Sequence, residues 1–296
     1  GVVSMFAVIS GALSNAISRY ITYGLGKGDK EKLKMIFCTS VNIQIIIALI
    51  IFVLCEIVGL WFLNSRMNIP EDRLVAANWV LHCSLLTFVV NLISVPYNAC
   101  IIAHEHMNAY AYISIFDAIL KMSVAYLLIV SPVDKLIAYS VLLFVTALGV
   151  RLLYGFYCGR HFKECKYKPI YDRVLFKEMM GFAGWNFFGN ATSVLNIQGV
   201  NILINVFFGV VANSARGIAS QIDAAVNQLV VTFTTAVNPQ ITKSYAQGDS
   251  QRLNYLVCKG AKFSFFLLLL FAVPLFFEAD TILKIWLVNV PEGASL

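Results

Sequence analysis

Residues 16–38 read AISRYITYGLGKGDKEKLKMIFC, and residues 236–258 repeat them weakly as AVNPQITKSYAQGDSQRLNYLVC. In the register that aligns Gly28 with Gly248, identical residues include Ala16, Ile21, Thr22, Gly28, Asp29, Leu33 and Cys38, which meet Ala236, Ile241, Thr242, Gly248, Asp249, Leu253 and Cys258. A parallel repeat of this kind in a very apolar chain is typical of membrane transporters. We therefore expect a membrane protein made of two related halves.

The composition excludes a water-soluble protein. Hydrophobic residues make up 59% of the chain and charged residues 13%, whereas about a quarter of the residues of a soluble domain are charged. The net charge of +6 is explained by basic loops that lie close to anionic lipid headgroups. Membrane lipids are thus the expected surroundings, and no nucleic acid is expected as a partner.

Eight apolar runs are long enough to cross a bilayer as helices. About 20 residues at 1.5 Å per residue span roughly 30 Å of hydrocarbon. The runs lie at about 2–23, 35–63, 75–102, 108–130, 136–158, 180–207, 211–241 and 256–288. The sequence therefore predicts an all-α, polytopic membrane protein with eight transmembrane helices in this chain.

The register of the repeat also predicts a longer parent. The run at 180–207 precedes the second copy, whereas the first copy lacks a counterpart in front of it, and the chain stops soon after the second copy. We expect a fragment of a parent with at least twelve spans. Residues 1–158 would be an N-terminal bundle without its first helix, 159–179 a cytoplasmic linker, and 180–296 a truncated C-terminal bundle.

Basic residues in the loops predict the orientation. The connections at 24–34, 159–177 and 243–262 are rich in lysine and arginine, whereas the alternate loops hold only Arg66, Arg73, Lys135 and Lys284. Such a bias places the first set of loops in the cytoplasm. Within the linker, residues 170–179 have the spacing of a short amphipathic helix on the inner leaflet. The seven cysteines lie in helices or on the cytoplasmic side, which favours free thiols.

Two local motifs are interpreted as structural. Gly24 to Asp29 has the composition of a phosphate-binding loop, but a spanning helix precedes it instead of a strand. We expect left-handed turns at Gly28 and Gly248, and helix caps at Asp29 and Asp249. His104 and His106 would point apart on a helix, and no third ligand is close in sequence, so no metal site is expected there.

The run at 211–241 carries a polar face. Its polar residues recur at steps of three and four, which puts them on one side of a helix: Asn213, Arg216, Ser220, Asp223 and Asn227. A charged side chain facing lipid near the middle of a span costs about 2.5–3.5 kcal/mol. We interpret this face as one wall of a substrate cavity, with polar packing between helices as the alternative.

Three other runs carry similar stripes. The run at 180–207 includes Asn186 and Asn190, the run at 75–102 includes Asn91 and Asn98, and the run at 108–130 includes Tyr110, Asp117 and Lys121. Asp117 and Lys121 are spaced i, i+4. They either neutralise each other or act in transport, with Lys121 binding an anion or Asp117 accepting a coupling proton.

Two stretches carry a family resemblance. Pro96-Tyr97-Asn98-Ala99 with Ile102-Ala103-His104-Glu105, and NSARGIA at 213–219 leading to NPQITKSY at 238–245, resemble the bacterial O-antigen or polysaccharide flippases. That family belongs to the multidrug/oligosaccharidyl-lipid/polysaccharide superfamily, with the multidrug and toxic compound extrusion transporters. The resemblance implies two six-helix bundles around a central cavity. It also implies transfer of an undecaprenyl-diphosphate-linked oligosaccharide from the cytoplasmic to the periplasmic leaflet of the bacterial inner membrane, with Arg216 as the cavity arginine.

The resulting hypothesis is a non-enzymatic flippase that works by alternating access. Arg216 and Lys121 would hold the diphosphate, while Tyr110 and the amides would face the sugars. No organic cofactor or metal is expected. Either a proton or a sodium ion could serve as the coupling ion. The sequence does not decide the oligomeric state. The rivals are a cation-coupled multidrug antiporter of the same superfamily and a membrane-embedded glycan polymerase or ligase.

Overall fold

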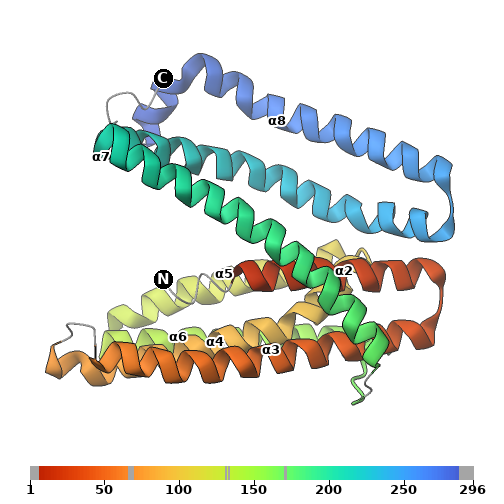
Figure 1. The fold of residues 1–296 in the computed structure, drawn as a ribbon, viewed down its shortest axis with the longest axis horizontal. Coiled ribbons are helices and arrows are strands. Elements are labelled where there is room, and N and C mark those ends of the chain that lie inside the picture. The colour runs from red at the N-terminus through yellow and green to blue at the C-terminus, as the bar shows by residue number, and fades with distance from the viewer. Residues whose placement is uncertain (1–6, 66–69, 131, 133, 170–171, 287–296) are drawn as a thin grey trace. The chain divides into compact units, whose positions relative to one another are not determined.

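The computed structural model describes the chain apart from residues 1–6, 66–69, 131, 133, 170–171 and 287–296. All of its described regular structure is helical, which confirms the predicted all-α class. The elements are α2 (Ala7–Lys27), α3 (Lys30–Ser65), α4 (Glu71–Ala103), α5 (Met107–Val130), α6 (Lys135–His161), the short 3₁₀ helix η1 (Lys163–Cys165), α7 (Arg173–Gln247) and α8 (Ser250–Trp286) (Figure 1).

The helices correspond to the apolar runs of the sequence. Gly209 interrupts α7 with φ 80° and ψ −174°, so the spans predicted at 180–207 and 211–241 are the two arms of this element. Among the described residues, six helices are long and apolar enough to cross a membrane: Lys30–Ser65, Arg73–Ala103, Met107–Ile129, Lys135–His161, Arg173–Gly209 and Ser250–Ala279. The other two predicted spans, 2–23 and 211–241, are helical where they are described.

The chain divides into two units, residues 1–187 and 188–296. The first arm of α7 begins at Arg173 and continues through the division. The short helix expected at about 170–179 is therefore continuous with the span expected at 180–207. Asp172 caps this helix, because its Oδ1 accepts hydrogen bonds from the backbone N–H groups of Val174 at 2.8 Å and Leu175 at 3.1 Å. The division between bundles and the lipid contact of this segment stay predictions.

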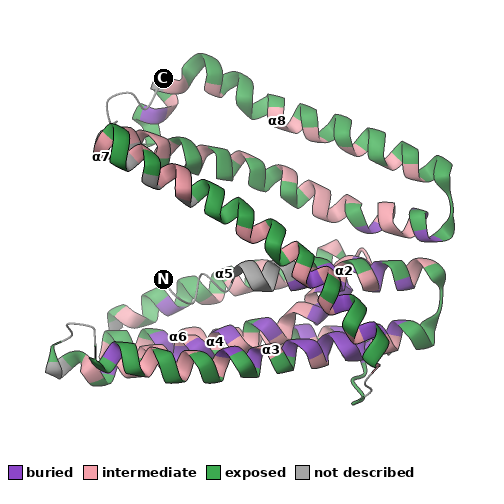
Figure 2. Cartoon of the chain, viewed as in Figure 1, coloured by how far each residue is buried: buried purple, intermediate pink, exposed green. Residues whose placement is uncertain are grey.

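In the first unit, α4 is the central helix. It packs against α2, α3 and α6, and α5 packs against α6 and α4. The main core gathers near the turns at 28–29 and 104–106 and near η1, where Phe37, Cys100, Ile101 and Cys158 are almost completely buried. Figure 2 shows the buried residues concentrated on α2, α3 and α4. This core fixes one end of the bundle firmly.

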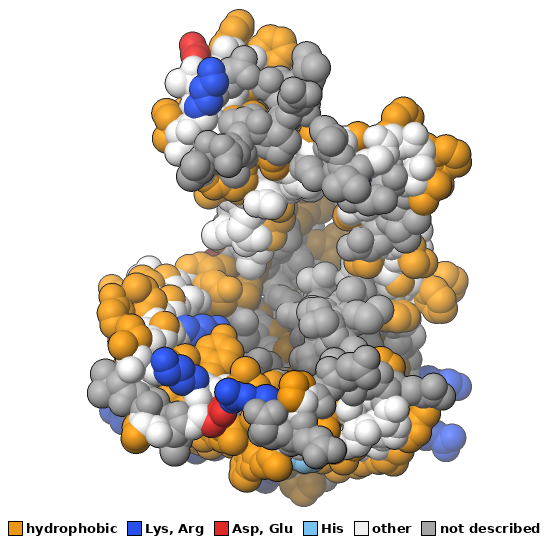
Figure 3. Space-filling view, turned by 90° about the vertical axis from the view of Figure 1, so that its left-hand side faces the viewer, with side chains coloured by type: hydrophobic (Ala, Val, Ile, Leu, Met, Phe, Trp, Pro, Cys, Tyr) orange, Lys and Arg blue, Asp and Glu red, His pale blue; other side chains and the backbone are white. Residues whose placement is uncertain are grey.

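The outer surface of the first unit is apolar. Along α3, Leu49, Ile57 and Val58 are 63%, 64% and 57% exposed, and similar residues cover α5 and α6. Figure 3 shows hydrophobic side chains over much of the described surface, with few charged groups between them. Such a surface is stable against lipid hydrocarbon and unfavourable in water.

The second unit contains the rest of α7 and α8. Phe233 of α7 and Phe263 of α8 are in edge contact, with ring centroids 6.3 Å apart. Most of the described side chains of this unit are half-buried or exposed (Figure 2). The helices are joined at Gln247–Ser250 by the second copy of the repeated turn.

The two copies of the turn have the same geometry. Gly28 has φ 75° and Gly248 has φ 76°, a left-handed conformation that glycine adopts at low cost. The carboxylate of Asp29 accepts a hydrogen bond from the backbone N–H of Lys32 at 3.0 Å, and Asp249 accepts one from that of Arg252 at 2.9 Å. The structural interpretation of the Gly-Asp motif is thus confirmed.

Candidate functional site

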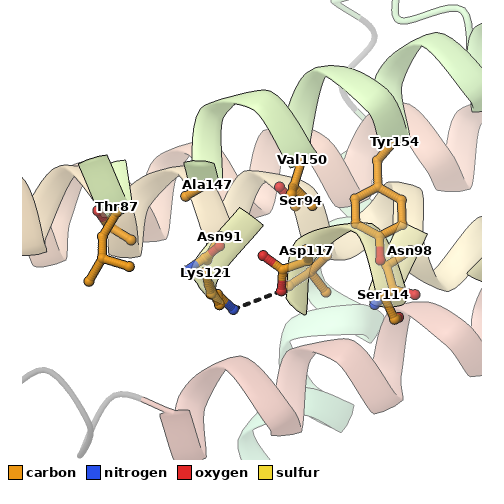
Figure 4. A pocket seen from close by; sticks show the side chains of 12 residues that line it. Thr87, Asn91, Ser94, Asn98, Ser114, Asp117, Lys121, Ala147, Val150 and Tyr154 are labelled. Atoms are coloured by element: carbon orange, nitrogen blue, oxygen red, sulfur yellow. Dashed lines mark hydrogen bonds and ion pairs between the residues drawn. The ribbon is translucent and has the colours of Figure 1, made fainter. Parts of the chain in front are cut away.

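A polar cavity of about 360 Å³ lies within the first unit. α4 contributes Thr87, Asn91, Ser94, Val95 and Asn98, α5 contributes Ser114, Asp117 and Lys121, and α6 contributes Leu143, Ala147, Val150 and Tyr154. Figure 4 shows the polar side chains of α4 and α5 converging on this space. The predicted stripes of α4 and α5 therefore face one cavity.

Three residues of the cavity wall on α4 offer hydrogen-bond acceptors. The hydroxyls of Thr87 and Ser94 donate to the backbone carbonyls of Cys83 and Val90, at 2.7 and 2.8 Å, which leaves their oxygens available as acceptors. The side-chain oxygen of Asn98 is buried and has no hydrogen-bond partner in the described part of the chain. A buried acceptor without a partner is costly, so water or a ligand hydroxyl would stabilise it.

One ion pair lies on the cavity wall. Lys121 Nζ donates to Asp117 Oδ2 at 2.7 Å across one turn of α5, as the dashed line in Figure 4 marks. Their side chains are 58% and 29% exposed, respectively. Because the two charges cancel, this wall has little net charge although it contains two ionisable groups.

Of the two tyrosines near this cavity, the sequence analysis selected Tyr110, whereas the structure places Tyr154 on the wall. Tyr110, expected to face the sugars, packs against the main core and is not among the cavity-lining residues. Tyr154 of α6, which the sequence analysis did not select, points toward Ser114 and Asn98 (Figure 4). The available signal was weak: Leu143, Ala147, Val150 and Tyr154 follow helical spacing, but apolar residues at that spacing usually form a core.

Asn186 and Asn190 lie on the first arm of α7. Asn186 belongs to the first unit, and its amide donates to the backbone carbonyl of Phe182 at 2.8 Å. Asn190 belongs to the second unit and is half-buried. Neither lines the polar cavity of the first unit.

The polar face of the second unit centres on Arg216. Its Nε donates to Asn201 Oδ1 at 3.0 Å, which connects the two arms of α7 across the break at Gly209. No described carboxylate lies within ion-pair distance of the half-buried Arg216 guanidinium. Within the described residues, this side chain therefore carries a positive charge whose hydrogen-bond partner is a neutral amide.

The remaining residues of this face lie along the same arm. Asp223 accepts a hydrogen bond from the amide of Asn227 at 2.7 Å, and Ser220 is exposed. Asn213 is helical, but its side chain lies outside the described residues. The carboxylate of this polar face, Asp223, is thus hydrogen-bonded to an amide one helical turn away.

Comparisons with known proteins agree with this architecture. The MatE family model matches residues 1–127. The uncharacterized membrane protein EpsK of Bacillus subtilis (strain 168) is 21% identical over 289 residues, which cover 97% of this chain and 57% of EpsK. The chain thus spans less than two thirds of this relative.

Solved structures share the fold at low identity. A MOP superfamily transporter from Pyrococcus furiosus, described as having a binding pocket of reversed polarity, matches with a TM-score of 0.80 and 13% identity, over 98% of this chain and 64% of that one. A MATE structure in the bent conformation matches with a TM-score of 0.83 and 11% identity, over 94% and 63%. An outward-facing MATE family multidrug resistance transporter matches with a TM-score of 0.80 and 12% identity, over 98% and 65%.

These matches extend over nearly all of this chain, and the MatE match covers its first four described helices almost completely. The families concerned are transporters, not enzymes. The chain is therefore a multi-pass membrane protein whose first 127 residues match the MatE family model and whose fold is that of solved transporters of the multidrug/oligosaccharidyl-lipid/polysaccharide (MOP) superfamily.

Proposed function

We propose that the whole protein flips an anionic, lipid-linked oligosaccharide of the undecaprenyl-diphosphate type from the cytoplasmic to the external leaflet of a bacterial cytoplasmic membrane. Transport would proceed by alternating access. The chain's relatives include structures described as bent, straight and outward-facing, so the fold supports several conformations in those proteins.

The observation that carries the proposal is the environment of Arg216. The sequence predicts that the arm of α7 with Arg216 crosses the membrane, and a guanidinium in a membrane helix is expensive unless it faces water, protein or a ligand. Here its contact in the described structure is the neutral Asn201. Guanidinium groups bind phosphate oxygens through paired, charge-assisted hydrogen bonds, which are stronger than neutral ones. A diphosphate is thus a chemically suitable partner.

The cavity of the first unit supports a sugar-containing cargo. Thr87, Asn91, Ser94 and Asn98 provide uncharged polar groups, and Tyr154 adds an aromatic ring with a hydroxyl. Sugars require many hydrogen bonds and little charge, and this wall offers both features. Lys121 would contribute to phosphate binding only after its ion pair with Asp117 opens.

The test is replacement of Arg216 in the full-length protein, expressed in a strain that lacks its own flippase. Arg216→Ala should lower surface polysaccharide about tenfold or more, because a hydrogen bond to a charged group contributes about 1.5–3 kcal/mol. Arg252→Ala removes the same charge from an exposed turn and is the control. Undiminished polysaccharide in Arg216→Ala at equal membrane abundance would contradict the proposal.

The second candidate is a cation-coupled multidrug antiporter. It is favoured by the MatE match and by the carboxylate of Asp117 in the cavity. Drug resistance that rises on expression and disappears in Asp117→Asn, with Arg216→Ala still active, would support the antiporter. The present charge distribution argues against it, because Lys121 already neutralises Asp117.

A further inference from the structure

Three buried thiols gather at the end of the first unit. Cys100 lies in the last turns of α4, Cys158 in the last turns of α6, and Cys165 in η1, and they are 0%, 0% and 5% exposed. Cys165 Sγ donates to Cys100 Sγ at 3.3 Å. Cys158 Sγ contacts the backbone carbonyl of Tyr97 at 3.4 Å.

A histidine and a glutamate complete the cluster. His104, directly after α4, forms a hydrogen bond through Nε2 with Glu164 Oε1 of η1. The His104 ring stacks on Phe162, with centroids 4.0 Å apart and planes inclined by 13°. The ligand atoms of Cys100, His104 and Glu164 all lie within 4.8 Å of one another. Two segments about 60 residues apart in sequence thus bring together a thiol, an imidazole and a carboxylate, with the second thiol of Cys165 beside that of Cys100.

We propose that Cys100, His104, Glu164 and Cys165 bind one Zn²⁺ ion. Thiolate, imidazole and carboxylate are the donors that zinc takes in proteins, usually four at a time and tetrahedrally. With bond lengths of about 2.0–2.3 Å, tetrahedral ligand atoms lie roughly 3.3–3.8 Å apart. The Sγ atoms of Cys100 and Cys165, 3.3 Å apart, already have such a separation, and the ligand atoms of Cys100, His104 and Glu164 lie within 4.8 Å of one another. Calcium and magnesium ions do not suit this set of ligands, because they prefer oxygen donors.

The burial of Glu164 is the second argument for a cation. Its side chain is only 12% exposed and that of His104 is 22% exposed, beside three sulfur atoms. A carboxylate in such surroundings is costly without a partner, and its partner here is the His104 ring. A dication would balance both the carboxylate and the thiolates, whereas the His104–Glu164 pair on its own balances only the carboxylate.

The site has a structural consequence. It would connect the end of α4 to η1, which lies between α6 and α7. Four protein ligands leave no open position, which is the arrangement of structural and not of catalytic zinc sites. Zinc would therefore hold the loop after α6 against the core of the first unit.

The test uses the purified full-length protein, freed of metal by a chelator and kept reduced. Titration with Co²⁺ should give the visible absorption of a tetrahedral site and sulfur-to-cobalt charge transfer, saturating at one ion per chain and reversed by Zn²⁺. Cys165→Ser and His104→Gln should lose or strongly weaken both signals. Cys83→Ser, a buried thiol elsewhere on α4, and His106→Gln, in the same turn as His104, are the matched controls and should keep them.

Because titration of the unchanged protein is itself decisive, the test does not depend on the variants folding. Folded protein that gives no thiolate–cobalt absorption would overturn the site. So would a signal that persists in His104→Gln and in Cys165→Ser alike. A Cys100–Cys165 disulfide found in protein isolated from cells without added oxidant would also overturn it, by assigning these thiols a redox role.

Discussion

Lys121 Nζ and Asp117 Oδ2 are 2.7 Å apart on the wall of the polar cavity, so the two charges of α5 are matched to each other. An i, i+4 pair that is this accessible contributes only about 0.3–0.5 kcal/mol to stability. Its importance is therefore electrostatic: it allows two ionisable groups to stand in a membrane helix while the cavity stays nearly neutral.

If the role of the Asp117–Lys121 pair is to keep the cavity without net charge, exchanging the two charges should preserve transport. We expect the double variant Asp117→Lys/Lys121→Asp to keep surface polysaccharide within about twofold of the parent, because the exchanged pair is only slightly weaker than the original. Asp117→Lys alone puts two cations in the cavity and should reduce membrane abundance. A well-expressed double variant without transport would instead show that Lys121 contacts the cargo directly.

The amide beside Arg216 offers a test of anion recognition that leaves the arginine in place. Asn201→Asp keeps the size of the side chain and converts the 3.0 Å hydrogen bond into an ion pair. We expect unchanged or slightly raised thermal stability but about tenfold less transport, since a phosphate must then compete with a built-in carboxylate. Asn254→Asp makes the same change at an exposed position of α8 and should have no effect. Full activity of Asn201→Asp would argue that Arg216 does not bind the cargo.

The features predicted most accurately are those decided locally. The repeated turn depends on a left-handed residue followed by a capping side chain, and both copies have that geometry at Gly28 and Gly248. Helix positions followed from the length of apolar runs, because bilayer thickness sets that length. The break at Gly209 lies between the spans predicted at 180–207 and 211–241, because each of these runs has the length that crosses a bilayer.

The lining of the polar cavity could be predicted only in part. The stripes of α4 and α5 were visible because polar residues are rare in membrane helices, and Asn91, Asn98, Asp117 and Lys121 do line one cavity. The residues that α6 contributes to the cavity wall were not predicted. Ala147 and Val150 are apolar and give no signal in the sequence, and they line the cavity because α6 packs against α4.

The cluster of Cys100, His104, Glu164 and Cys165 shows the limit of sequence spacing more clearly. The sequence analysis of His104 and His106 found no metal site. Cys100 lies one helical turn before His104, but Glu164 and Cys165 follow about 60 residues later. A tertiary contact between the end of α4 and η1 is needed to see the four donors together.

The cap of α6 predicts a pH dependence of stability. Hydrogen bonds from the backbone N–H of Leu136 and Ile137, with Arg73 at 2.5 Å, hold the pKa of Asp134 below its ordinary 3.8. A lowered folded-state pKa stabilises the protein above pH 3.8 and loses that contribution as the pH falls further. Asp134→Ala should thus lower the melting temperature at pH 7, and the difference from the parent should shrink below pH 3.8.

Arg73→Gln is the control for this cap. It removes the ion pair but keeps the two backbone hydrogen bonds of Asp134, so its effect on melting should be smaller than that of Asp134→Ala. A difference between parent and Asp134→Ala that stays constant across the acidic range would show that the carboxylate charge contributes nothing to the cap.

Gly209 provides the last prediction, since its backbone occupies a region that only glycine enters without strain. At φ 80° and ψ −174°, a Cβ atom costs about 1–3 kcal/mol even though no other atom lies within 4 Å of its position. Gly209→Ala should therefore lower thermal stability and loosen the Arg216–Asn201 contact across the break. Gly199→Ala lies inside the first arm of α7, also with open space around it, and should be neutral or stabilising because alanine favours helix by about 1 kcal/mol. Melting curves of the two variants in the same detergent decide the matter: equal shifts would mean that the backbone conformation at Gly209 does not control the junction of the two arms.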